Sequence, residues 1–462
     1  MGSLSANALS EELAWTMRVA HVLGLVELFG HASLKAGDSE KMLVTPGRIP
    51  GSPPPNRLRG SDILTTDLKG KLLAGKSPAP RDLAMHLAIY RNRPDVKAVI
   101  HTHQPEMLLF GLVDRELLPL MHQNADKVQK PLPRFGHGEL VTSFAQGETL
   151  SQTMGDSFAC HLPGHGLLIA GPGLLEALTW AHQLEELARM NRLAASMGPV
   201  KTVNAEQASR IASQRAGMED FRAYYASLDP GPKSPPPPMP AANSTDGARQ
   251  RVISACRILH RFGLARHLEH VSHRLPDKNR FVINPRGSMA QIQAEELAAV
   301  DMEGRWVEGP FPPPPFCLLH RDIFATRPDV QAIVHTHEIY GRLYPAAGLA
   351  IPPIHRLGAT VAQQPLPVYD VPDLIFDEEP RRAVVAALSQ GSMVHERAHG
   401  TDYAARNIEE AVAAAVHREW SARLHHRASQ LGTPNLLPGP ILAGLKAELP
   451  AAGEWWDYWR GL

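Results

Sequence analysis

Cysteine is scarce in this chain, which has three cysteines among 462 residues. So few thiols cannot build a disulfide framework, and their number favours a reducing, cytoplasmic location. No run of about 18 apolar residues occurs, which argues against a membrane-spanning helix. The first apolar stretch is interrupted by Glu11, Glu12 and Arg18, unlike a signal peptide.

An excess of charge of either sign is also missing. Lys and Arg together number 47, as do Asp and Glu, so the formal net charge is zero. We therefore expect neither a nucleic-acid partner nor an anionic membrane partner. Histidine, by contrast, is abundant, with 23 residues. The length exceeds that of one typical core and predicts two domains of roughly 150–200 residues each.

A proline-rich segment divides the chain at residues 228–247, LDPGPKSPPPPMPAANSTDG. Such a segment cannot form a helix or a central strand, and we expect a stiff, extended spacer. The predicted domains are then residues 1–227 and 248–432, followed by a tryptophan-rich tail at 433–462. Three of the seven tryptophans lie in that tail, where they are expected to anchor packing or an interface.

The two sides of the spacer are related. The sequence RPDVKAVIHTH at 93–103 recurs as RPDVQAIVHTH at 327–337, a spacing of 234 residues (327 minus 93). The same spacing links His86 to His320 and His165-Gly to His399-Gly. A constant spacing over separate landmarks indicates two copies of one fold, which we name copy one and copy two.

Each copy mixes helical and strand patterns. In copy one we expect helices at 80–92, from 172 into the 190s and at 205–226, with strands at 96–103 and 167–170. Copy two repeats this with a strand at 330–337 and a helix from about 404 to 428. The chain is therefore predicted to hold two α/β domains, with a strand order that the sequence does not determine.

The histidines of the repeat favour a metal site. His101 and His103 are two residues apart near a strand end, so both side chains lie on one face of the sheet. His165, between glycines, is the natural third ligand. A lone HxH pair is commonly only packing, but here the pair and the later His-Gly both recur in copy two. Three neutral imidazoles with an open fourth position are typical of a catalytic site.

These motifs resemble the class II aldolase/adducin family over nearly all of both halves. The resemblance implies two tandem α/β/α sandwich domains with largely antiparallel central sheets. It also implies a divalent metal, zinc first, with manganese, iron or cobalt as the other options. The implied metal ligands are His101, His103 and His165 in copy one, and His335, His337 and His399 in copy two.

The family's acid/base residue is a Glu four positions before the helix histidine. Asp82 stands there in copy one and keeps a carboxylate with one methylene less, which makes it the catalytic candidate. An acidic residue favoured at a helix N-terminus is the competing interpretation. Phe316 stands there in copy two and cannot move a proton. Copy two thus resembles a metal-binding domain with altered chemistry, unless another carboxylate substitutes: Asp322, Glu338 or Glu396.

The family's Gly-Asn-x-Ser phosphate loop is also altered, because the matching stretches read His31-Ala-Ser33 and His270-Val-Ser272. Without the Gly-Asn pair a phosphate nest is less expected. Arg48 offers a guanidinium suited to a carboxylate, or is an ordinary loop arginine. The predicted substrate-binding residues are Ser33, Thr45 and Arg48.

Together these features predict a metal-dependent carbon–carbon lyase. It would cleave an aldol or decarboxylate a small hydroxy- or keto-carboxylic acid, with an aromatic acid as one option. An iron oxygenase on the same three histidines and a non-catalytic, adducin-like scaffold are the alternatives. The expected partners are the small-molecule acid and a second tandem chain, the two chains forming a dimer that is a pseudo-tetramer. The proton donor is left open among Tyr340, Tyr403, Tyr458, His122 and His355.

Overall fold

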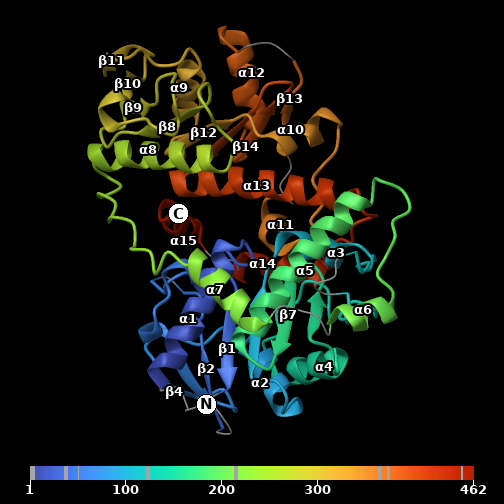
Figure 1. Cartoon of the computed structure of the whole chain (residues 1–462). Helices are drawn as coiled ribbons and strands as arrows, with labels where there is room; N and C mark the ends of the chain where they lie inside the picture. The colour runs from blue at the N-terminus through green and yellow to red at the C-terminus, as the bar shows by residue number, and fades with distance from the viewer. Residues whose placement is uncertain are drawn as a thin grey trace. The chain divides into compact units, whose positions relative to one another are not determined.

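The computed structural model describes residues 6–35, 40–49, 51–120, 125–212, 217–362, 366–371, 375–448 and 451–462 (Figure 1). The chain forms two compact units. The first comprises Met1–Pro235, Ile354–Arg356 and Arg427–Gly444, and the second comprises Pro236–Pro353, Leu357–His426 and Leu445–Leu462. The boundary between Pro235 and Pro236 falls inside the predicted spacer, of which residues 229–241 form neither helix nor strand.

The first unit contains a seven-stranded sheet in the order β4-β3-β2-β1-β5-β7-β6, with every neighbouring pair antiparallel. Strand β5 lies inside the sheet and all of its residues are buried, which explains its apolar sequence. The strands are β1 (His31–Lys35), β2 (Lys41–Val44), β3 (Leu64–Asp67), β4 (Leu72–Ala74), β5 (Ala98–Thr102), β6 (Ala159–Leu162) and β7 (Gly166–Gly171).

Helices cover both faces of this sheet. Leu87 of α2 and Leu150 of α4 pack with Val99 and Leu168 of the sheet in one apolar core. Helices α1 and α5 pack together on the other face, against β1, β5 and β7. The helices are α1 (Ala6–Val22), α2 (Leu83–Asn92), α3 (Pro105–Leu112), α4 (Phe144–Met154), α5 (Leu174–Ala194), α6 (Ala205–Ala212) and α7 (Met218–Leu228), with 3-10 turns at Pro55–Arg57 and Gly60–Asp62.

The second unit repeats this plan with eight strands in the order β11-β10-β9-β8-β12-β15-β14-β13. Its neighbouring pairs are antiparallel except β13–β14, which is parallel. The strands are β8 (His270–Arg274), β9 (Arg280–Ile283), β10 (Ala298–Asp301), β11 (Trp306–Glu308), β12 (Ala332–Thr336), β13 (Val368–Tyr369), β14 (Met393–Glu396) and β15 (Thr401–Ala405).

The core of the second unit lies under α9 and α12, where Ile323 and Val384 pack with Val300 and Ile333 of the sheet. Helix α8 packs against β8 and β9 on the other face. The remaining elements that follow the spacer in sequence have these bounds: α8 (Thr245–Arg261), α9 (Cys317–Thr326), α10 (Ile339–Ala346), α11 (Arg356–Ala362), α12 (Glu378–Leu388), α13 (Ile408–Ser429), α14 (Gly439–Glu448), α15 (Ala452–Arg460) and a 3-10 turn at Ala294–Glu296.

The strands predicted at 96–103 and 330–337, which lead into the two His-Thr-His sequences, are present as β5 and β12. The helix predicted at 80–92 is present as α2. The predicted start of the helix near residue 404 was wrong, because Thr401–Ala405 form β15 and α13 begins at Ile408. Asn407 accounts for this start, since its side-chain oxygen accepts the backbone N–H of Glu410 and caps the helix. The predicted helix at 205–226 is divided into α6 and α7, and residues 213–216 lie outside the described chain.

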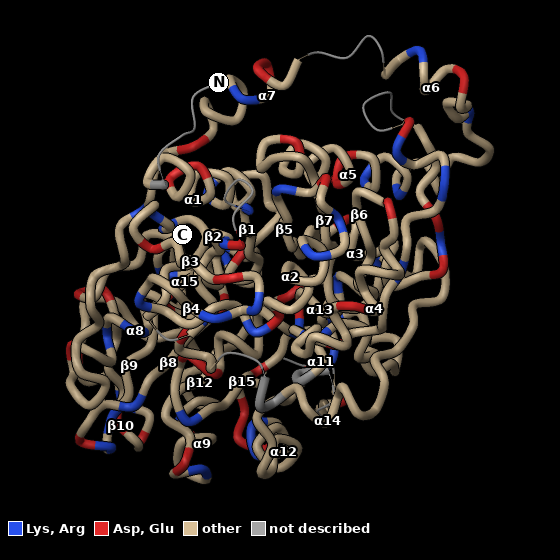
Figure 2. Tube along the Cα trace, turned by 90° about the horizontal axis from the view of Figure 1, so that it is seen from below, with Lys and Arg blue, Asp and Glu red and all other residues tan. Residues whose placement is uncertain are grey.

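Figure 2 shows basic and acidic residues interspersed along the chain, in keeping with its balanced charge. Within the described residues, the helices are too short or too polar to cross a bilayer.

The tryptophan-rich tail is divided between the units: residues 433–444 belong to the first, and residues 445–462, which hold the three tryptophans, belong to the second. Helix α15 buries Trp455 and Trp459, whose rings lie 4.9 and 5.6 Å from the ring of His417 on α13. The Trp459 ring also lies 5.4 Å from Phe262, at the end of α8. Burial in this aromatic cluster lowers the pKa of His417 to about 4.

We predict that His417→Phe makes the protein less sensitive to acid. Between pH 6.5 and 4 the unfolded chain protonates His417 but the folded chain does not, so wild-type stability falls as the pH decreases. From pH 7 to pH 5 this residue should cost the wild type about 2 kcal/mol of unfolding free energy, a loss that the phenylalanine variant does not suffer. Urea denaturation of both proteins at the two pH values measures the difference. An equal loss in both proteins would contradict the prediction.

Candidate metal centre

The first histidine cluster lies where β5 ends. His101 is buried on β5, and His103 follows directly after the strand. The turn between β6 and β7 brings His165 to the same place. Gly166 is required there, because a Cβ atom at that position would lie 2.3 Å from the carbonyl oxygen of Thr102. The glycine next to the third histidine therefore permits the close approach of the two segments.

The three rings face one point. His101 Nε2 and His103 Nε2 are 2.9 Å apart, and the His165 ring centroid lies 4.8 Å from that of His101. One nitrogen from each ring lies within 4.8 Å of the others. Tetrahedral zinc with Zn–N distances near 2.05 Å places its ligands roughly 3.3 Å apart. The set therefore fits a divalent ion with small adjustments.

The protonation of the rings also suits a metal. His101 Nδ1 donates to the carbonyl of Leu167 at 3.1 Å, which leaves the Nε2 lone pair free for an ion. Burial lowers the pKa of His101 to about 4 and lowers the pKa values of His103 and His165 well below their ordinary value. The rings are therefore neutral at physiological pH, which is the ligating form.

Asp82 presents its carboxylate to this cluster. Its Oδ1 lies 2.8 Å from His31 Nε2, and the two residues form a close group with His101. Burial alone would raise the pKa of Asp82, but the charge and hydrogen bond of His31 lower it well below the ordinary value. Asp82 precedes α2 without capping it, since its side chain accepts no backbone hydrogen bond there. Asp82 is therefore both the residue at the N-terminus of α2 and a neighbour of the histidine cluster, and its catalytic role remains a prediction.

Behind Asp82 runs a chain of buried polar groups that sequence reasoning did not assemble. His31 Nδ1 lies 2.8 Å from His86 Nε2, and His86 Nδ1 lies 2.7 Å from Ser33 Oγ. Ser33 Oγ in turn lies 2.8 Å from the Tyr90 hydroxyl. The available sequence signal was that His31 and His86 both recur in copy two, as His270 and His320.

The predicted substrate-binding residues contact protein groups. The Ser33 hydroxyl is engaged in the buried chain, and the Thr45 hydroxyl accepts the N–H of Ala32 at 3.2 Å. Arg48 Nη1 donates to the carbonyls of Ser52 at 2.5 Å and Ile49 at 3.3 Å. Their roles toward a substrate remain predictions.

His355 belongs to the first unit and lies at the copy-one cluster. Its imidazole donates to the backbone carbonyl of His165, and its nearby charge contributes to the lowered pKa values of His103 and His165. Of the other proton-donor candidates, Tyr403 donates its hydroxyl to Glu338 at 3.0 Å, and His122 lies outside the described residues.

Copy two builds the same cluster. His335 Nε2 and His337 Nε2 are 3.2 Å apart, and the His399 ring lies 4.8 and 5.0 Å from theirs. Phe316 occupies the position of Asp82, with its ring 5.2 Å from that of His399. Among the three possible substitute carboxylates, Glu396 contacts the cluster, through His399.

The other two substitutes are engaged elsewhere. Asp322 pairs with Arg381 at 2.7 Å. Glu338 accepts hydrogen bonds from Thr336 and Tyr403.

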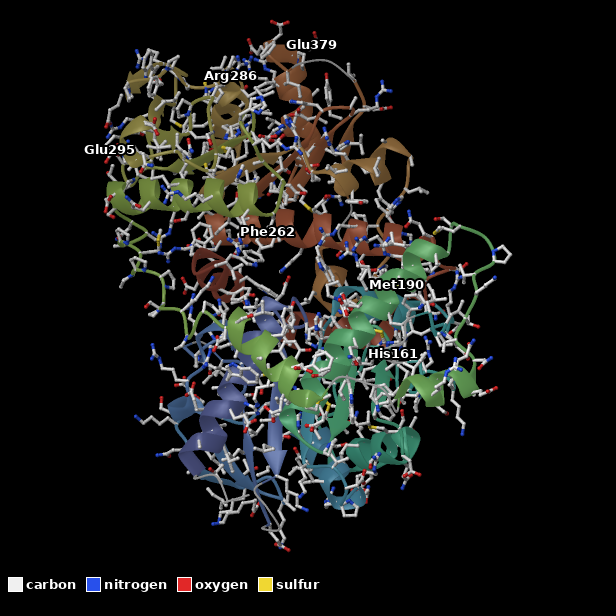
Figure 3. The ribbon with its side chains drawn as sticks, in the orientation of Figure 1. His161, Met190, Phe262, Arg286, Glu295 and Glu379 are labelled. Atoms are coloured by element: carbon white, nitrogen blue, oxygen red, sulfur yellow. The ribbon has the colours of Figure 1, made fainter. Side chains whose placement is uncertain are left out.

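Recurrence alone does not place a histidine in the site. His161 on β6, labelled in Figure 3, recurs as His395 on β14. Its ring is buried, and burial together with the charge of Arg134 lowers its pKa to about 3. His395 Nδ1 lies 3.1 Å from the Thr401 hydroxyl.

Comparison with known proteins identifies the family. The model of the class II aldolase and adducin N-terminal domain matches residues 11–191 and 250–426. The chain therefore belongs to this family and carries two tandem copies of the domain, as the repeat predicted. The predicted fold, two mixed α/β domains with mostly antiparallel sheets, is also confirmed.

Relatives with different activities are similar to this chain. The 3,4-dihydroxyphthalate decarboxylase of Arthrobacter keyseri is 30% identical over 200 residues, which are 40% of this chain and 80% of that protein. The L-fuculose phosphate aldolase of Methanococcus maripaludis (strain C7) is 31% identical over 163 residues, 35% of this chain and 83% of that protein. A solved structure, L-fuculose 1-phosphate aldolase from Glaciozyma antarctica PI12, is 23% identical with a TM-score of 0.41, covering 48% of this chain and 90% of that one.

We predict that the purified chain binds two divalent ions. His101→Ala and His335→Ala should each lose one equivalent of zinc, and the double variant should lose both, because each substitution removes a ligand from one cluster. Mass-spectrometric metal analysis after dialysis gives the count, with His417→Phe as a buried-histidine control that keeps both ions. An unchanged count in either single variant would exclude that cluster as a metal site.

Proposed function

We propose that this protein is a metal-dependent carbon–carbon lyase acting on a small hydroxy- or keto-carboxylic acid, and that copy one is its active site. The observation that carries the proposal is the Asp82 carboxylate facing His101 in copy one, where copy two has the apolar ring of Phe316. Both clusters fit an ion, but in copy one a proton acceptor occupies this position.

A divalent ion bound by His101, His103 and His165 would supply a Lewis acid that stabilises negative charge on substrate oxygens. Asp82, ionised and held by His31, is placed to accept a proton from a substrate hydroxyl or a water. The chain of His31, His86 and Ser33 fixes the orientation of this carboxylate. Burial lowers the pKa of His355, at the edge of the cluster, to about 3, and its N–H is donated to the carbonyl of His165. His355 is therefore not assigned as the donor for the carbon that is left after bond cleavage.

The acid substrate is favoured over a sugar phosphate for two reasons. In the stretch that matches the family's Gly-Asn-x-Ser phosphate loop, His31 stands where the family has Asn, between Gly30 and Ala32. One similar protein is a decarboxylase of an aromatic dicarboxylic acid, 3,4-dihydroxyphthalate. Decarboxylation and aldol cleavage both leave a negative charge next to the metal, so one site serves either reaction.

We expect Asp82→Asn to lower kcat by about 10²- to 10⁴-fold, because the amide keeps the shape but cannot accept the proton. CO₂ release from 3,4-dihydroxyphthalate and aldehyde release from L-fuculose 1-phosphate are measured with zinc, manganese, cobalt and ferrous iron. His101→Ala should abolish turnover, whereas His335→Ala should keep measurable turnover with lower thermal stability.

Equal loss of turnover in His101→Ala and His335→Ala would overturn the assignment of catalysis to copy one. If the protein consumes oxygen with ferrous iron and cleaves no substrate without oxygen, it is an iron oxygenase and the lyase assignment is wrong. If a wider panel of hydroxy- and keto-acids also gives no turnover, the alternative of a non-catalytic, adducin-like scaffold protein is favoured.

We also propose that two tandem chains assemble as a dimer in which the four copies form a pseudo-tetramer. Light scattering of the full chain should give about twice the 50.5 kDa chain mass. A monomeric mass over the working concentration range would contradict this assembly.

A further inference from the structure

In copy two, the Nδ1 atom of each cluster histidine contacts a carboxylate on the side of the ring away from the other histidines. His335 Nδ1 lies 3.0 Å from Asp402 Oδ1, and His337 Nδ1 lies 3.0 Å from Glu269 Oε1. His399 Nδ1 contacts Glu396 Oε2. Each ring thus turns Nδ1 to its own carboxylate, and the Nε2 atoms of His335 and His337 lie 3.2 Å apart.

Copy one lacks these three carboxylates. Asp402 pairs with His335 across β12 and β15, and Leu168 pairs with His101 at the same register across β5 and β7. Glu396 corresponds to Leu162 at the repeat spacing of 234 residues, and Glu269 precedes His270 as Gly30 precedes His31. In copy one the partner of His101 Nδ1 is instead the carbonyl of Leu167.

The open side of the copy-two cluster is covered by an aromatic ring. The Phe316 ring lies 5.2 Å from His399, 5.4 Å from His270 and 6.3 Å from His335. Phe376 packs on it at 5.1 Å, and Phe316 is only 8% exposed. Among the described residues, an apolar ring thus takes the place that the Asp82 carboxylate has in copy one.

These arrangements have opposite effects on an ion and on a substrate. A carboxylate that accepts the Nδ1–H fixes the tautomer of a metal-binding histidine and raises its basicity. Removing such a carboxylate typically lowers the metal affinity 10- to 100-fold. Asp402, Glu396 and Glu269 are also nearly fully buried, at 0, 1 and 6% exposure. The negative charges of Asp402 and Glu269 are costly to bury unless a positive charge compensates them, and a dication in the centre would do so.

We propose that copy two is a structural metal centre that holds its ion more tightly than copy one, and that Asp402, Glu396 and Glu269 set this affinity. The proposal rests on the proposed metal binding of both clusters and adds a division of labour: one exchangeable catalytic ion and one retained ion. The retained ion would tie the end of β12 to the turn between β14 and β15, which carries His399.

The test is a zinc competition on the full-length holoprotein, with a chromophoric chelator of known zinc affinity. We expect two classes of ion that differ at least tenfold in affinity. His101→Ala should keep the tight class alone, and His335→Ala the weak class alone. Asp402→Leu, which installs the copy-one residue, should weaken the tight class 10- to 100-fold and leave the weak class unchanged.

Two further variants serve as a fallback and as a control in this test. Asp402→Asn keeps the side-chain shape and should weaken the tight class less than leucine does, so it serves if Asp402→Leu does not fold. Asp370→Asn changes an exposed copy-two carboxylate that pairs with Arg397, and should change neither class.

One class of ion, or an unchanged tight class in both Asp402 variants, would overturn the proposal, as would a copy two that binds no zinc. Because zinc release is measured without turnover, these outcomes are separate from failure of the lyase function. If copy two binds zinc more tightly than copy one but the protein has no lyase activity, the structural metal centre is supported and only the proposed reaction is wrong.

Discussion

The geometry of this protein depends on burying three imidazoles at the end of one central strand. Strand β5 is paired on both sides, so His101 cannot leave the sheet without breaking two ladders of hydrogen bonds. His103 follows it, and His165 approaches through a turn that only glycine permits. Neutral, buried ring nitrogens that face one point are unfavourable unless something polar occupies the centre. The metal hypothesis follows from this constraint more than from any single motif.

The duplication lets one fold carry two versions of that constraint. Both copies keep the histidines, the strand register and the polar pair of His31 with His86 or His270 with His320. They differ in where the carboxylate stands. In copy one it lies on the open side, as Asp82, where a reactant would be. In copy two the carboxylates lie behind the rings, and an aromatic ring takes the open side. This difference in the position of the carboxylates is the basis for the two roles proposed for the copies, catalysis in copy one and retention of an ion in copy two.

Sequence reasoning predicted much of the fold because the relevant signals are local or repeated. Proline at Pro94 and the apolar run that follows place a helix end and a buried strand, and the 234-residue spacing defines two domains. Sequence reasoning placed the start of α13 four residues early, because residues 401–405 form a strand by pairing with both β12 and β14. The apolar and small residues of that stretch suit either structure, and long-range pairing decided between them.

For the site, the sequence alone determined the six repeated histidines, the carboxylate at Asp82 and its loss at Phe316, because these depend on residue type and spacing. Only the tertiary structure decided which groups stand behind each ring. Glu269, Asp402 and Glu396 are separated from their histidine partners by 68, 67 and 3 positions, and the backing role of each follows from strand register and turn geometry. The placement of His355 beside His165 is likewise a property of the folded chain, since proximity between distant segments is set by packing and not by sequence order.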